Sequence, residues 1–344
     1  MLVQSSENAH SDNVAAEGTV MRTLSDLIDK LLSFAKDDGI YRTPIPRLTI
    51  IRHSEPTVPE LVLYAPALCV VAQGAKEARL DNRSYRYDAA HYLLGSVQLP
   101  VLGAVVEATK RAPFVCLRLD LDSMLVAELL ELATLPDLRA KALAGLELGA
   151  MDDELLDAIV RLADVIHRTK DVAVLAPLIE REVIWRLFQY PESAAMLARM
   201  VTSGSRLREM TKVISWLEQH FGEPATTSDL AALAGMSLSS FHQHFRAVTG
   251  TSPLRFRNRL RLMAARRLMV VKGYEAAEAG FAVGYQEPSQ FSREYSRQFG
   301  LPPKRDAERL RRSGLAEIVT VHGGSFDKEP GGTRTNHDDF SAQH

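Results

Sequence analysis

The chain has 344 residues, of which 46% are apolar and 24% are charged, and its formal net charge is −2. This composition predicts a folded protein of two or three domains and excludes a largely disordered chain. No apolar run approaches the roughly 18 residues that a membrane helix needs, and the first residues lack the basic start and apolar block of a signal peptide. We therefore expect a cytoplasmic protein with no membrane partner.

The small net charge hides an uneven distribution of charge along the chain. Between Arg206 and Arg312 there are 18 Lys and Arg against 10 Asp and Glu. This third of the chain is therefore basic, while the remainder is acidic. The asymmetry predicts that one domain binds a polyanion.

The N-terminal part begins with a polar segment, residues 1–20, that we expect to be a flexible tail. From about 48 to 121, short β-rich segments alternate with turns marked by Pro, Gly and Asn. Six or more strands at this spacing predict a small barrel or sandwich. Four of its tyrosines either line a cavity for a small molecule or simply pack: Tyr64, Tyr85, Tyr87 and Tyr92.

Residues from about 123 to 200 show apolar positions three and four apart, as at Leu175 and Leu178, which predicts amphipathic helices. These faces are explained by packing on the barrel, and a helix-to-helix face in a homodimer is compatible with that. Residues 201–207 contain a Ser-Gly-Ser run and are expected to form a linker. We therefore expect an N-terminal domain over residues 21–200.

The C-terminal part, residues 208–312, is expected to be entirely helical, and residues 323–344 to be a second flexible tail. Its first notable feature is His242 and His244, which have the His-x-His spacing of many metal sites. On a helix these side chains lie about 200° apart, so they cannot bind one ion. No metal site and no cofactor are expected.

Residues 227–248 have the pattern of a helix-turn-helix motif, with a turn at Gly235. One stripe of the second helix is apolar and is expected to face the domain: Leu238, Phe241, Phe245 and Val248. The opposite stripe carries hydrogen-bonding groups that can reach bases or phosphates: Ser239, His242, Gln243 and Arg246. The motif therefore predicts DNA binding.

The pattern is repeated over residues 275–299, about 50 residues further on. Its inward positions are Phe291, Tyr295 and Phe299, and its outward positions are Ser289, Ser292, Arg293 and Ser296. Between the two copies lies a basic helix of about 20 residues, or roughly 30 Å. This is close to the roughly 34 Å between successive major-groove faces of a duplex, so one monomer could place both copies on one side of DNA. Some of the arginines on this helix are expected to contact phosphate and others to form intramolecular pairs.

The segment "WLEQHFGEPATTSDLAALAGMSLSSFHQHFRAVTGTSPLRFRNRLRLMAARRLM", with "AVGYQEPSQFSREYSRQFGLPPKRD", resembles the DNA-binding domain of AraC/XylS-type bacterial transcription regulators. The segments "LVLYAPALCVVAQGAKEARL" and "VLAPLIEREVIWRLF" are similar to the AraC-type N-terminal effector domain. The resemblance implies an α+β multidomain protein with a cupin-like β-barrel for a small-molecule effector, helices that dimerise, and a domain with two helix-turn-helix motifs joined by a long linker helix. It further implies that the protein binds promoter DNA and activates transcription by contacting RNA polymerase.

Carried over by position, the base-reading places of the family fall on Ser239, His242 and Gln243, and on Pro288, Ser289 and Arg293. The serine at 239 is short, so Gln243 and Arg293 are the stronger candidates. Gly280 departs from the alanine that is common in the family, and a glycine inside a helix costs roughly 1 kcal/mol and is expected to loosen the second motif.

Cys69 lies in the apolar run "ALCVVAQG" and is either a small buried residue or a thiol that reacts with oxidants or electrophiles. No basic side chain adjoins it in its own strand, which argues against reactivity. The barrel region has His53 and His91 but no metal-ligand cluster, and the chain has no G-x-S-x-G motif. No enzymatic activity is therefore expected. The alternative function is a small-molecule-binding or thiol-based sensor or interaction protein with weakened DNA binding, and no effector-binding residue is assigned.

Overall fold

The computed structural model describes residues 22–133, 145–202 and 205–312. Both predicted tails and two residues of the predicted linker, Ser203 and Gly204, lie outside the described residues. In the described part, no helix combines the length and the apolarity needed to cross a membrane.

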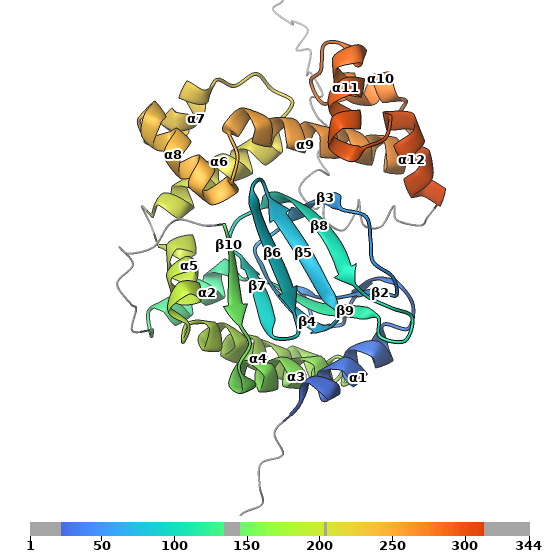
Figure 1. The fold of residues 1–344 in the computed structure, drawn as a ribbon. Coiled ribbons are helices and arrows are strands. Elements are labelled where there is room, and N and C mark those ends of the chain that lie inside the picture. The colour runs from blue at the N-terminus through green and yellow to red at the C-terminus, as the bar shows by residue number, and fades with distance from the viewer. Residues whose placement is uncertain (1–21, 134–144, 203–204, 313–344) are drawn as a thin grey trace, which may run out of the picture.

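The described N-terminal part contains ten strands in two antiparallel sheets (Figure 1). One sheet has the order β1-β2-β9-β4-β7-β10 and the other the order β3-β8-β5-β6. The strands are β1 (Gly39–Arg42), β2 (Leu48–His53), β3 (Glu60–Tyr64), β4 (Ala67–Gln73), β5 (Ala75–Leu80), β6 (Arg83–Asp88), β7 (His91–Gly95), β8 (Leu99–Glu107), β9 (Phe114–Asp120) and β10 (Leu146–Ala150).

The six-stranded sheet is buried on both of its faces. Successive side chains of a strand point to opposite faces, so β4 sends Leu68 and Val70 to one hydrophobic core and Cys69 and Val71 to another. The first core lies under helices, and the second lies between the two sheets. This explains why the central strands read as continuous apolar runs rather than as alternating ones.

The described N-terminal part has five helices beside the sheets: α1 (Leu24–Phe34), α2 (Ser123–Leu130), α3 (Asp153–Val165), α4 (Val172–Leu187) and α5 (Pro191–Val201). Helices α1, α3 and α4 form a layer at the end of the sheets opposite the C-terminal helices (Figure 1). They share a core with the outer face of the six-stranded sheet. This layer therefore covers the outer face of the six-stranded sheet.

Four elements differ from the sequence predictions. Strand β10 lies within the region expected to be helical, where it pairs antiparallel with β7 through Leu146 and Gly95. Strand β1 and helix α1 precede the β-rich region predicted from about residue 48, although both lie within the predicted N-terminal domain, residues 21–200. On α4, Leu175 and Leu178 do not pack on the barrel, since they are 37% and 60% exposed. The helix buries its other side instead.

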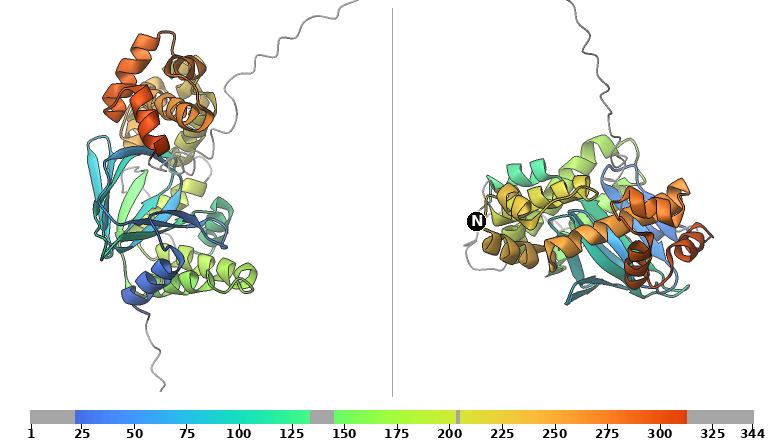
Figure 2. Two further views of the ribbon diagram at one scale, coloured as in Figure 1. Left: turned by 90° about the vertical axis from the view of Figure 1, so that its right-hand side faces the viewer. Right: turned by 90° about the horizontal axis from the view of Figure 1, so that it is seen from above.

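The C-terminal part consists of α6 (Arg206–His220), α7 (Thr227–Leu233), α8 (Leu238–Thr249), α9 (Pro253–Arg267), the π-helical turn η2 (Leu268–Lys272), α10 (Ala276–Ala282), α11 (Pro288–Phe299) and α12 (Pro303–Arg312). Seen from above, α9 runs between two groups of helices (Figure 2). Thr226 and Asp229 form a capping box at the start of α7, and Pro288 occupies the first turn of α11. Together, α9 and η2 make up the predicted 20-residue connecting helix.

The helical part rests on the sheets at two places. At the first, the turn between β5 and β6 contacts the start of α9, where Asp81 pairs with Arg255 at 3.3 Å. At the second, Glu60 of β3 lies 3.3 Å from Arg309 of α12 and 3.7 Å from Arg266 of α9. Each half of the helical part therefore has its own polar contact with the barrel.

Candidate nucleic-acid interface

The first helix-turn-helix motif is built by α7 and α8, with Gly235 between them at φ 62°. Three residues of α8, Phe241, Phe245 and Val248, are fully buried and fix its orientation. The prediction that Leu238 also faces the domain is wrong, because this side chain is 46% exposed. Leu238 is the first residue of α8, and at this end the helix is not yet covered by the rest of the domain.

The predicted outward face of α8 is exposed. It consists of Ser239, His242, Gln243 and Arg246. Within the described residues none of these four side chains is recorded in a hydrogen bond or ion pair, so their polar atoms are available to a ligand. His244 is half-buried, and burial lowers its pKa.

The second motif is built by α10 and α11, whose Phe291 and Tyr295 are fully buried. Gly280 lies where these helices cross, and a Cβ there would be 3.0 Å from the Phe291 ring. The missing side chain permits close packing of these helices, so Gly280 also has a packing role that the sequence prediction did not include. The turn residue Gly284 has a φ of 90°, and a Cβ there would lie 2.7 Å from the carbonyl oxygen of Gly222.

The outward face of α11 is smaller than that of α8. Pro288, Ser289 and Arg293 are exposed, whereas Ser292 and Ser296 are half-buried. Among the described residues, no recorded carboxylate pairs with the Arg293 guanidinium. Arg293 is thus the cation of this face that is free to contact DNA.

Most arginines of α9 are used inside the protein. Arg257 donates to the Ala225 carbonyl oxygen at 3.0 Å, and Arg261 donates to that of Phe221 at 2.6 Å. Their charges join α9 to the loop before α7, which orients the first motif. Helix α9 is therefore a strut, that is, a helix that holds the two motifs apart at a fixed separation.

The far end of α9 is joined to α12 by a buried ionic cluster. Asp306, which is fully buried, accepts from Arg266 at 2.8 Å, from Arg309 at 2.9 Å and from the Tyr295 hydroxyl at 2.9 Å. Burial alone raises the pKa of Asp306, but these donors outweigh it and hold the pKa below its usual value. The cluster ties the recognition helix α11 to the contact with Glu60.

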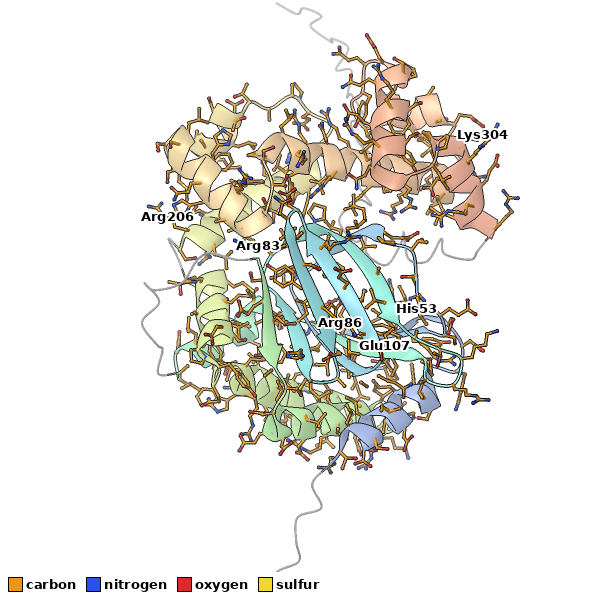
Figure 3. The ribbon with its side chains drawn as sticks, viewed as in Figure 1. His53, Arg83, Arg86, Glu107, Arg206 and Lys304 are labelled. Carbon is orange, nitrogen blue, oxygen red and sulfur yellow. The ribbon has the colours of Figure 1, made fainter. Side chains whose placement is uncertain are left out.

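Sequence reasoning missed the two carboxylates that hold the parts together, Glu60 and Asp81. In the sequence, each is simply an acidic residue beside a turn, and acidic residues at such positions are usually exposed to solvent. It also missed Lys304 and Arg305, which are exposed in the first turn of α12. Lys304 and Arg206 lie toward opposite ends of the helical part (Figure 3), so positive charge extends beyond the two predicted faces.

A cavity of about 230 Å³ opens beside the barrel strands. Its walls are largely apolar, and its polar side chains are those of His53, Thr57, Glu60 and Lys76. His53 lies near the end of the barrel (Figure 3), and burial lowers its pKa. Among the described residues, no group of three or more His, Cys, Asp or Glu is placed to hold a metal ion.

The predicted tyrosines divide between cavity and core. Tyr64 and Tyr87 line a second, smaller cavity and their hydroxyls are 3.4 Å apart. Tyr92 is buried in the other core and hydrogen-bonds to Ser193 at 2.8 Å, and Tyr85 is half-buried against the core between the sheets. Both alternatives thus occur in the same barrel.

Two family models match separate parts of the chain. Residues 44–195 match the N-terminus of AraC-type transcriptional regulators, and residues 230–309 match a helix-turn-helix domain. Among curated proteins, the HTH-type transcriptional activators RhaS of Salmonella heidelberg and Salmonella schwarzengrund are each 24% identical over 155 residues, or 45% of this chain. The match spans 55% of each RhaS, so the chain covers about half the length of these relatives.

Among solved structures, the fold is similar to that of ToxT from Vibrio cholerae. The unsaturated-fatty-acid-bound form gives a TM-score of 0.50 at 13% identity, covering 79% of this chain and 96% of ToxT. The apo K231A form gives 0.51 at 12% identity, covering 81% and 100%. At this identity the likeness concerns the fold alone. The two domain matches stand in sequence order, so the chain resembles AraC-type transcriptional regulators in its N-terminal part and helix-turn-helix domains in its C-terminal part.

Proposed function

We propose that the protein is a sequence-specific DNA-binding transcriptional regulator that responds to a small-molecule effector. The observation that carries this proposal is the pair of exposed polar faces on α8 and α11, at the two ends of the strut α9. Base edges are read by side chains with free hydrogen-bonding groups. Gln243 on the first face and Arg293 on the second meet that requirement.

The two faces are proposed to read successive major-groove segments of promoter DNA. Residues 208–312 form the DNA-binding domain in this account, and residues 201–207 link it to the N-terminal domain. Arg246 and Ser292 flank the base-reading positions and would contact phosphates. His242 could donate to a phosphate or a base. Ser239 and Ser289 have short side chains, which would mainly allow their helices to come close to the DNA.

Residues 21–200 are proposed to sense the effector and to dimerise, with the two sheets as a cupin-like barrel. The 230 Å³ cavity supports this, because its apolar walls carry few polar groups, as small-molecule sites do. Within the described chain no recorded carboxylate pairs with Lys76, whose ammonium lies 5.4 Å from the centre of the Tyr64 ring. A small amphipathic molecule with an acidic group would therefore fit, and ToxT was solved with an unsaturated fatty acid bound.

Effector binding is proposed to reach the DNA-binding domain through Glu60. This carboxylate lines the cavity and pairs with Arg309 and Arg266, whose partner Asp306 is bonded to α11 through Tyr295. An acidic group bound at Lys76 would repel the Glu60 carboxylate in the same cavity and so weaken its pairs with Arg309 and Arg266. Such a differential contact is what a ligand needs in order to shift a conformational equilibrium.

Dimerisation is proposed to use the exposed side of α4. Val174, Leu178 and Trp185 lie on one face of this helix and are 64%, 60% and 36% exposed. An apolar row of this kind favours contact with a second copy of the chain over contact with water. Activation through contact with RNA polymerase is proposed from the family and from the RhaS activators.

The proposal is tested by gel-shift titration of the purified protein against the DNA upstream of its own gene and of the neighbouring genes. We expect a specific complex that is lost, by roughly tenfold or more in affinity, on Arg293→Ala. The matched control is Arg111→Ala, an exposed arginine in the loop between β8 and β9. Binding of no duplex above the non-specific level at low salt would favour the alternative of a sensor with weakened DNA binding.

A further inference from the structure

The only two cysteines of the chain are brought together inside the barrel. Cys69 lies on β4 and Cys116 on β9, and these neighbouring strands pair Val71 with Cys116 and Cys69 with Arg118. The two cysteines are thus offset by two residues, and both point into the space between the sheets. Both line the smaller cavity, whose volume is about 20 Å³.

The thiols lie in an electropositive environment. Lys76 of β5 and Arg118 of β9 line the same cavity. No basic side chain adjoins Cys69 in its own strand, as the sequence indicated, and both cations come from other strands. Arg118 also pairs with Asp120 at 2.7 Å, and Lys76 lies near the Tyr64 ring.

In this environment the pKa values of the two thiols shift in opposite directions. The Cys116 thiol donates to the carbonyl oxygen of Leu117 at 3.5 Å and lines the small cavity together with Cys69. The nearby Cys116 thiol stabilises the Cys69 thiolate, which outweighs the effect of burial and, with the two cations, lowers the pKa of Cys69 to about 7. The same interaction and burial raise the pKa of Cys116. The thiolate is the nucleophilic form of cysteine, so Cys69 is the attacking group and Cys116 the resolving one.

The size of the cavity limits which oxidants or electrophiles can reach the two thiols. A volume of about 20 Å³ exceeds the roughly 10 to 15 Å³ that one water needs but leaves no room for a bulky electrophile. The small cavity shares Ile51 and Lys76 with the 230 Å³ cavity, so the two cavities are neighbours. Hydrogen peroxide is a small neutral molecule, so it suits a cavity of this size.

We propose that Cys69 and Cys116 form a peroxide-reactive dithiol within the barrel, which closes to an intramolecular disulfide. The Cys69 thiolate attacks one peroxide oxygen, the O–O bond breaks, and the leaving hydroxide takes a proton to become water. The resulting sulfenic acid is attacked by the Cys116 sulfur, which releases a second water and forms the S–S bond. Two thiols are oxidised by two electrons and one peroxide is reduced, so the step balances. Use of this step to switch DNA binding rests on the proposed function, whereas the thiol chemistry does not.

The test is peroxide titration of the full-length protein, followed by thiol counting under denaturing conditions and by intact mass. Wild type is expected to lose both thiols and two hydrogens per chain, and to regain them with dithiothreitol. The Cys116→Ser variant should stop at a sulfenic acid that a dimedone probe traps, and the Cys69→Ser variant should keep its thiol. The variant carrying both changes has no thiol and reports background oxidation of methionine.

A second comparison isolates the electropositive environment. Lys76→Gln removes the ammonium and should slow the loss of the Cys69 thiol several-fold, while Lys110→Gln, on the exposed loop between β8 and β9, should leave it unchanged. Two free thiols in wild type at peroxide levels that already oxidise methionine would overturn the proposal. So would equal rates of thiol loss in Cys69→Ser and Cys116→Ser. Gel shifts of the oxidised and reduced protein then ask separately whether the disulfide changes DNA binding.

Discussion

The carboxylate of Glu60 on β3 lies 3.3 Å from the guanidinium of Arg309 on α12, and the same carboxylate forms part of the wall of the larger barrel cavity. Because one residue has both contacts, the cavity and the second helix-turn-helix motif are neighbours in the fold although they are far apart in the sequence. The Glu60 side chain is 13% exposed, so its ion pairs are weakly screened by solvent.

Glu60→Gln is expected to loosen α12 without unfolding the barrel. The lost charge should lower the local free energy of opening by about 1 to 2 kcal/mol, since hydrogen bonds to charged groups contribute roughly that amount. Hydrogen exchange should therefore quicken in α12 and remain unchanged in β4 and β9. Glu55→Gln, in an exposed ion pair with Lys110, is the control. Unchanged exchange in α12 would show that Glu60 does not hold the second motif.

Asp306→Asn is expected to destabilise the C-terminal part by about 3 kcal/mol, because it leaves the buried guanidinium of Arg266 without its main charged partner. The pKa of Asp306 is depressed in the folded protein, so the ionised carboxylate stabilises the fold above its unfolded pKa of 3.8. That stabilisation disappears as the pH falls through the lower folded pKa.

Urea unfolding of Asp306→Asn at pH 7 and near pH 3 measures both effects. The difference from wild type should be large at pH 7 and smaller in acid. Glu308→Gln, at an exposed pair with Arg312 in the same helix, should change little at either pH. Equal stability of wild type and Asp306→Asn at pH 7 would contradict the assigned role of this cluster.

The contribution of Glu218 of α6 to the free energy of unfolding depends on pH in the opposite direction from that of Asp306. Burial raises the pKa of Glu218 to about 8, and its Oε1 has no hydrogen-bond partner among the described residues. A carboxyl group that is more basic in the folded state binds its proton more tightly there, so stability falls as the pH rises from about 4.5 to 8. Glu218→Gln should therefore be more stable than wild type at pH 8, by an amount on the order of 1 to 3 kcal/mol.

The measurement for Glu218→Gln is the free energy of unfolding between pH 5 and pH 8. The slope seen in wild type should be reduced in this variant and preserved in Glu223→Gln, which changes an exposed carboxylate in the following loop. A wild-type stability that rises over this range in parallel with that of Glu218→Gln would mean that the group is ionised in the fold.

Leu178→Glu is expected to dissociate the proposed homodimer. It places a charge in the apolar row on α4, where burial in an interface would be costly, but leaves a side chain that is 60% exposed in the monomer. Sedimentation equilibrium should give a dimer for wild type and a monomer for this variant. Leu132→Glu changes a leucine that is equally exposed, at 64%, but lies after α2 and outside the row. A monomeric wild type, or a dimer in both variants, would exclude this interface.

The two helix-turn-helix motifs were predictable because their packing is local. The spacing of Phe241 and Phe245, and of Phe291 and Tyr295, fixes which side of each helix is buried, and the outward residues follow from helix geometry. Leu238 escaped this rule because it begins its helix. The close approach of Gly280 to Phe291 was not predicted, because it is a contact between two helices, which propensity alone does not describe.

The β-rich N-terminal domain was predictable as a class but not in its strand pairing. The alternating segment of β10, Leu146–Ala150, has only five residues and lies among helices, so its pairing with β7 is what identifies it as a strand. In the same way, the proximity of Cys69 to Cys116, Lys76 and Arg118 depends on the order of the strands in the sheets. Contacts between residues that are far apart in sequence, such as Glu60 with Arg309, leave no periodic signal.

In the proposed function, one chain reads DNA with two motifs that α9 holds at a fixed separation. Duplexes selected from a random pool by the protein should contain two short elements about one helical turn, or roughly 10 base pairs, apart. Inserting 5 base pairs between them turns the second element to the other side of the duplex, and fluorescence anisotropy should then show an affinity loss of about tenfold or more. An insertion that leaves the affinity unchanged, or a selection that yields no common sequence, would contradict the account.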